Sequence, residues 1–137
     1  MKSLNILVVS RELNIIQRSL KSVCESVEAF VNFSTGATRK SILEEGHNPK
    51  DYDVLIIDTP DDIVLKNGKR FSTYCKEINP NCHIVGTDVY LKYLKEETPK
   101  REYERIITIS PFNSEEVQKM LEDYKQQKEK REQWFVL

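Results

Sequence analysis

The chain of 137 residues is poor in glycine and cysteine, with four and three residues, and has no long apolar run. So few glycines leave no place for the glycine-rich loop that cradles the phosphates of a nucleotide. The cysteines, Cys24, Cys75 and Cys82, match neither a CxxC redox pair nor a zinc pattern, so we expect reduced thiols. The longest apolar runs, residues 6–9 and 54–57, are far below the ~20 residues that a membrane-spanning helix needs.

The chain also lacks an excess of either charge, with 21 basic and 22 acidic residues. A neutral balance provides no field that would attract nucleic acid or an anionic membrane, so we expect neither as a partner. The first apolar segment runs into Arg11 and Glu12 without a small-residue cleavage site, which is unlike a signal peptide. We therefore expect one cytoplasmic domain over residues 1–137, which is a common domain size.

Apolar runs alternate along the chain with segments of helical periodicity. Residues 4–9 and 54–57 are continuous apolar runs, typical of strands covered on both faces of a parallel sheet. The segment after the first run has apolar residues on one stripe of a helix, at Leu13, Ile16, Leu20 and Val23. Further strands are expected at residues 27–33, 83–87 and 105–109, and further helices at 37–45, 70–78, 89–97 and from Asn113 or Ser114 onward. This order predicts an α/β fold, a flavodoxin-like doubly wound sandwich with a five-stranded parallel sheet of order 2-1-3-4-5 and five helices.

Polar residues stand at the carboxyl ends of the expected strands, where the ligand site of such a fold lies. They are Ser10 and Arg11 after the first strand, Asp58 at the end of the third, Thr87 at the end of the fourth and Ser110 after the fifth. Because these strand ends lie along one edge of the sheet, we expect the five residues to form one pocket, with Glu12 beside it.

Four segments make the chain resemble the receiver domain of bacterial response regulators over nearly its whole length. ILVVSRE (residues 6–12), YDVLIID (52–58) and HIVGT (83–87) are similar to the first, third and fourth receiver strands, and ITISPFNSEEV (107–117) is similar to the fifth strand, the Lys-Pro-Phe turn and the capped last helix. The resemblance implies that Asp58 is a phosphoacceptor, phosphorylated by a histidine kinase or a small donor, and that Thr87 is the switching hydroxyl. It also implies a divalent cation held by carboxylates and a lysine that pairs with the phosphate.

The chain departs from the receiver pattern where the cation and the phosphate would bind. Ser10 and Arg11 stand where receivers have an acidic pair, and Ser110 stands where they have the lysine. A guanidinium competes with a hard cation, so Mg²⁺ is disfavoured, Glu12 and Asp58 are weak candidates as metal ligands, and we expect no cofactor. Loss of the lysine removes a charge-assisted hydrogen bond of ~1.5 to 3 kcal/mol. We hypothesise that Arg11 pairs with Asp58 and holds the site in one charged arrangement without phosphorylation.

Other interpretations of Asp58 stay open. An aspartate at a strand end can also cap a turn through neighbouring amides. The segment VLIIDTP is similar to the Walker B strand of P-loop ATPases, but the first strand is followed by SRELN, which has no glycine. We expect Asp61 and Asp62 to be solvated loop residues rather than replacement metal ligands, and His83 to be a half-buried strand residue.

The last segment, residues 125–137, combines a charged helical end with an apolar tail. Residues 125–133 carry charges of both signs, and residues 134–137 are apolar. An apolar terminus either folds back on its domain or contacts another protein, so Trp134 and Phe135 are candidate interaction residues.

The leading functional hypothesis is a stand-alone, non-enzymatic, atypical response-regulator protein that acts in signal transduction through protein contacts, with weak or no phosphorylation. Its partner would be a histidine kinase or a regulatory protein, and it would also be able to form a homodimer. One alternative is a working phosphoacceptor that uses Asp58 in a two-component phosphorelay. The other is a receiver-like part of a transcriptional regulator.

Overall fold

A computed structural model describes residues 3–10, 13–34, 46–58, 71–88, 103–109 and 111–136, with only the backbone described for residues 13–15, 71 and 134–136. The described strands form one parallel sheet in the order β2-β1-β3-β4-β5. Their bounds are β1 (Asn5–Ser10), β2 (Phe30–Ser34), β3 (Val54–Asp58), β4 (His83–Thr87) and β5 (Arg105–Ile107). The sheet order confirms the predicted flavodoxin-like arrangement.

The three central strands are buried along nearly their whole length. Every residue of β3 and β4 is buried, and so is every residue of β1 after Asn5. Apolar side chains on both faces of a parallel strand are what continuous apolar runs predict, because layers cover the sheet on both sides. The register pairs Ser10 with Asp58 and Ile57 with Gly86, which places the carboxyl ends of these three strands side by side.

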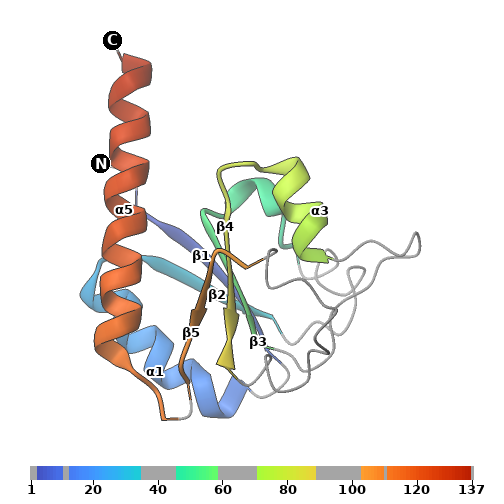
Figure 1. Ribbon diagram of the computed structural model, residues 1–137, viewed down its shortest axis with the longest axis vertical. Helices are drawn as coiled ribbons and strands as arrows, with labels where there is room; N and C mark the ends of the chain where they lie inside the picture. Colours follow the sequence, from blue (N-terminus) through green and yellow to red (C-terminus); the bar gives the residue numbers. More distant parts are fainter. Residues whose placement is uncertain are drawn as a thin grey trace.

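Helices cover both faces of the sheet (Figure 1). On one face, α1 (Leu13–Ser26) and α5 (Ser114–Val136) contact each other and share the larger apolar core. The other face has α3 (Phe71–Ile78), which contacts the short 3-10 helix η1 (Pro49–Asp51). The helices predicted at residues 37–45 and 89–97 lie outside the described residues.

Some strand boundaries differ from the prediction for local reasons. β2 begins at Phe30 rather than at residue 27, because the end of α1 occupies the residues before it. The Ala29 amide donates to the Cys24 carbonyl at 2.8 Å, and Glu28 has a φ of 57°, in the left-handed region that commonly ends a helix. β1 begins and ends one residue later than predicted, and β5 ends at Ile107, two residues earlier.

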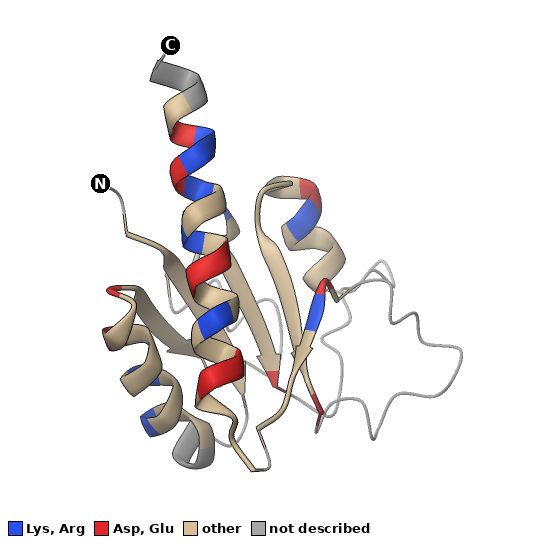
Figure 2. Ribbon diagram, turned by 60° about the vertical axis from the view of Figure 1, so that its left-hand side comes forward, with Lys and Arg blue, Asp and Glu red and all other residues tan. Residues whose placement is uncertain are grey.

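α5 runs past the end of the sheet, and residues 134–136 of the predicted apolar tail are part of this helix (Figure 1). Figure 2 shows basic and acidic residues along this helix. Within the charged helical end, Lys128 is only 9% exposed. Its Nζ donates to the Ser3 carbonyl at 2.7 Å and pairs with Asp53 Oδ2 at 2.8 Å. Lys128 thus ties the C-terminal half of α5 to the amino-terminal end of the sheet.

All three cysteines are buried, and none forms a disulfide. Burial raises the pKa of Cys24 and of Cys82 to about 12, so both thiols stay protonated at neutral pH. Within the described part of the chain, no helix combines the length and the apolar character that crossing a bilayer requires.

Candidate functional site

Asp58 ends β3, and its carboxylate is held between the ends of the two neighbouring strands. The Ser10 hydroxyl, at the end of β1, donates to Asp58 Oδ2 at 2.8 Å, and the Thr87 hydroxyl, at the end of β4, donates to Oδ1 at 2.8 Å. Ser10 and Thr87 are fully buried, and Asp58 is 9% exposed. Each carboxylate oxygen therefore accepts one hydroxyl, and each of three strands contributes one side chain.

Neither of the described residues that contact Asp58, Ser10 and Thr87, supplies a second carboxylate to a magnesium ion. Mg²⁺ requires several oxygen ligands with carboxylates among them. Ser10, directly opposite Asp58 in the sheet, offers a neutral hydroxyl whose proton points to the carboxylate. Among the residues with a described position, no group of three or more His, Cys, Asp or Glu side chains could hold a metal ion. The arrangement suits a buried carboxylate whose charge is stabilised by hydrogen bonds, each worth ~1.5 to 3 kcal/mol.

The structure brings together three of the residues predicted to share this pocket, Ser10, Asp58 and Thr87. The other predicted positions lie outside the described residues: Arg11, Glu12, Ser110 and the loop acids Asp61 and Asp62. The pairing of Arg11 with Asp58 therefore stays a prediction. The backbone of Trp134 and Phe135 lies in α5, and their role in an interaction stays a prediction too.

Asp88 follows Thr87 and joins the end of β4 to the chain that leads into α5. Its Oδ1 accepts the backbone amide of Ile109 at 3.0 Å. The carbonyl of Thr108, one residue earlier, accepts the Asn113 amide at 3.2 Å. The Asn113 side chain in turn caps α5 by accepting a backbone amide of its first turn at 3.1 Å. Short hydrogen-bonded steps thus connect the strand that carries Thr87 with the start of α5.

A second polar cluster lies at the opposite end of the sheet, where β4 begins. The His83 ring stacks on Tyr124 of α5, with centroids 3.8 Å apart and planes inclined by 9°. His83 Nδ1 lies 2.6 Å from Glu104 Oε2, and the Arg105 guanidinium lies 5.1 Å from the centroid of the Tyr124 ring. The expected half-buried position of His83 was wrong, because the residue is only 6% exposed. No sequence pattern indicates this cluster, because its members come from separate elements.

Ionisation in this cluster is set by burial and by the neighbouring charges. Burial lowers the pKa of His83 below the usual value for histidine, and the opposing attraction of Glu104 does not offset it. Partial burial alone would raise the pKa of Glu104. Two neighbours outweigh that effect and lower the pKa of Glu104: the Tyr124 hydroxyl and the His83 ring. The Tyr124 hydroxyl lies near the carboxylate but outside hydrogen-bonding geometry. At neutral pH the pair is a neutral imidazole beside a carboxylate.

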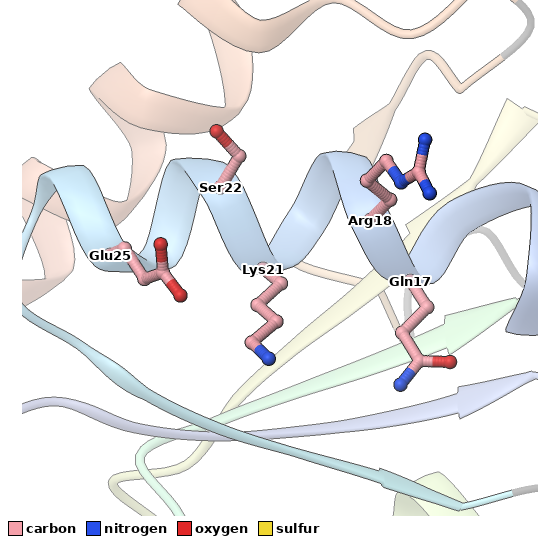
Figure 3. A pocket seen from close by; sticks show the side chains of 5 residues that line it. All are labelled: Gln17, Arg18, Lys21, Ser22 and Glu25. Carbon is pink, nitrogen blue, oxygen red and sulfur yellow. The ribbon is translucent and has the colours of Figure 1, made fainter.

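An open hollow of about 560 Å³ runs along α1, and its described lining residues all belong to that helix. Figure 3 shows Gln17, Lys21 and Glu25 along one side of the helix, with Arg18 and Ser22 pointing elsewhere. The described part of the lining carries both charges and does not include Ser10, Asp58 or Thr87.

No protein-family model matches the chain, and no curated protein matches it. Solved structures do match. The signal receiver domain of an HD domain-containing protein from Pseudomonas fluorescens Pf-5 is similar with a TM-score of 0.64 and 17% identity, over 97% of this chain and 94% of that one. A response regulator receiver domain protein from Clostridium thermocellum has a TM-score of 0.62 and 18% identity, over 92% and 97%. The chain has the receiver-domain fold.

The same fold occurs in a structure of adenylate cyclase from Rhodopirellula baltica, with a TM-score of 0.60 and 14% identity, over 99% of this chain and 100% of that one. At such identities the similarity concerns the fold. In the receiver-domain fold, Asp58 occupies the carboxyl end of the central strand, and Ser10 and Thr87 occupy the ends of the strands on either side.

Proposed function

We propose that this protein is a signal-transduction module of the receiver type that acts through protein contacts, and that Asp58 serves as a fixed buried carboxylate rather than as a phosphoacceptor. The observation that supports this role is the engagement of both carboxylate oxygens by Ser10 and Thr87 at 2.8 Å. The proposal assigns no catalytic group to the chain.

Phosphoryl transfer to a carboxylate requires an oxygen that can attack and a cation that neutralises the phosphoryl group. In this chain the Ser10 hydroxyl satisfies one oxygen of Asp58 from the position where the receiver pattern has a carboxylate. The receiver lysine is replaced by Ser110. A nucleophile without a cation or a lysine partner forms and keeps an acyl phosphate poorly, so the proposed output does not depend on one.

One observation favours the alternative of a working phosphoacceptor. Thr87 contacts Asp58 directly. A hydroxyl that responds to a phosphoryl group on Asp58 would need such a contact. The experiment below separates the two proposals.

The test is exposure of the purified chain to acetyl phosphate with millimolar Mg²⁺, followed by intact mass and amide spectra. We expect no phosphoryl adduct and no shift of the Asp58 amide. The triple variant Ser10→Asp, Arg11→Asp, Ser110→Lys restores the receiver residues and should gain an adduct. The same variant with Asp58→Asn is the control and should lose it. An adduct on the unmodified chain that Asp58→Asn removes would refute the proposal and establish the phosphoacceptor.

We further propose a cytoplasmic protein partner, either a histidine kinase or a regulatory protein, or a second copy of this chain. Its binding would involve the end of α5, where Trp134 and Phe135 follow one another in the helix. Light scattering during size exclusion measures whether the chain forms a homodimer. The variant Trp134→Ser, Phe135→Ser should weaken self-association or partner binding, whereas Gln133→Ser should not, and equal behaviour of the two would contradict a contact there.

A further inference from the structure

His83 is a buried imidazole whose two nitrogens have different environments. Nδ1 lies 2.6 Å from Glu104 Oε2, whereas Nε2 is buried and has no hydrogen-bond partner among the residues that the structure describes. Beside a carboxylate, a neutral imidazole carries its hydrogen on Nδ1, so Nε2 is the unprotonated nitrogen. A second proton would therefore have to go to the buried, unpartnered atom.

Accepting that proton in place is costly, because an N–H group would be buried without an acceptor. The ring is stacked closely on Tyr124, with centroids 3.8 Å apart, which leaves no layer of water between them. Tyr124 is itself 1% exposed. A protonated ring can hydrate Nε2 only if the contact between His83 and α5 opens.

Charged side chains from the elements packed against His83 act on a protonated ring. Glu104, before β5, attracts a protonated ring, and it is partly exposed, with a side-chain exposure of 44%. Lys76 of α3 and Arg131 of α5 repel it. Arg105 of β5 already lies 5.1 Å from the centroid of the Tyr124 ring, so an imidazolium would be a second cation at that ring. The attraction by one carboxylate is thus opposed by burial and by two cations, Lys76 and Arg131.

We propose that protonation of His83 loosens the contact between α5 and the sheet, so that the packing of α5 depends on pH. Tyr124 lies in the middle of α5, and the start of that helix is hydrogen-bonded to the chain after β5. Protonation of His83, at the amino-terminal end of the sheet, would therefore change the packing of α5. The start of this helix is linked to the strand that carries Thr87. This inference does not depend on the chemistry of Asp58.

The chain offers a matched control, because it has only two histidines. His47 Nδ1 lies 2.8 Å from the Tyr52 hydroxyl, away from α5, and His47 is partly exposed. The experiment follows the ring signals of both histidines by NMR between pH 7.5 and 5.5, together with hydrogen exchange of the α5 amides corrected for its intrinsic pH dependence. The variants His83→Gln and His47→Gln assign the two signals and separate their effects.

In the unmodified chain and in His47→Gln, hydrogen exchange of the α5 amides should be up to about tenfold faster at pH 5.5. The reason is that the opened state accepts a proton on His83 at the usual histidine pKa of about 6.5, whereas the closed state resists it, so acid favours opening. In His83→Gln, the corrected exchange rate of the α5 amides should not change between pH 7.5 and 5.5. An acceleration that persists in His83→Gln would overturn the proposal. So would a His83 signal that titrates as an ordinary histidine while α5 exchange does not change, and this second outcome needs no variant to fold.

Discussion

The contact of Lys128 with Asp53 allows a quantitative test of how α5 is held. Lys128 Nζ donates to Asp53 Oδ2 at 2.8 Å and to the Ser3 carbonyl at 2.7 Å, and the same Asp53 oxygen accepts the Asn5 amide at 2.8 Å. The two charged side chains are 11% and 17% exposed. The perturbation is Lys128→Met, which keeps the aliphatic stem of the side chain and removes the charge.

Removing one member of a buried ion pair leaves the other charge without its partner and costs about 3 to 5 kcal/mol. The Asn5 amide still donates to Asp53, and both side chains retain some contact with water. We therefore expect the lower end, a loss of about 3 kcal/mol in the free energy of unfolding. The double variant Lys128→Met, Asp53→Asn removes both charges and should recover a third or more of this loss, because no isolated carboxylate stays buried.

Urea unfolding followed by circular dichroism measures these free energies, and Lys130→Met is the control. Lys130 is exposed on the same helix, so its substitution should change the stability by less than about 0.5 kcal/mol. The reasoning is refuted if Lys128→Met and Lys130→Met unfold at the same urea concentration. It also fails if the double variant is less stable than Lys128→Met alone.

Three further predictions concern single positions. Glu28→Gly should raise the free energy of unfolding by about 1 kcal/mol in urea, since glycine adopts the observed φ of 57° without strain; a decrease would contradict this. Gly86→Ala should lower it by about 1 to 3 kcal/mol, because the new Cβ would lie 3.1 Å from a ring carbon of the buried Tyr103; an unchanged midpoint would show that the ring moves aside. Cys24 and Cys82, with pKa values raised to about 12 from 9.0, should react with a disulfide reagent at pH 8 about a thousandfold more slowly than in urea, and equal rates would mean that the core opens readily.

The central part of the fold could be predicted from the sequence because the signal is local. The continuous apolar runs before Ser10 and Asp58 correspond to strands buried on both faces, β1 and β3. Since strand ends in a parallel sheet lie together, the contacts of Asp58 with Ser10 and with Thr87 followed from the strand order. Their roles did not follow, because the direction of a hydroxyl depends on packing.

The features that were missed depend on contacts between distant segments or on unusual local choices. The end of α1 has Glu28 at a left-handed φ where glycine is the usual signal, so β2 was predicted to begin too early. Lys128 lies in a charged run that predicts a solvated face. Its spacing from Leu121 and Tyr124 nevertheless places it on the buried stripe of α5, a periodicity that a charged residue conceals. The partner that makes burial possible, Asp53, is 75 residues away.

These contacts place α5 under the influence of both ends of the sheet. At the carboxyl end, Asp88 and Asn113 link the strand that carries Thr87 to the first turn of the helix. At the amino end, His83 and Lys128 fix its second half through a ring stack and a buried ion pair. A helix held at its first turn and near its middle can transmit a displacement from one of these points to the other, because its backbone hydrogen bonds form a continuous ladder. A partner that binds the projecting end of α5 would therefore respond to the state of His83 more strongly than to that of Asp58, since the ring stack lies nearer to that end of the helix.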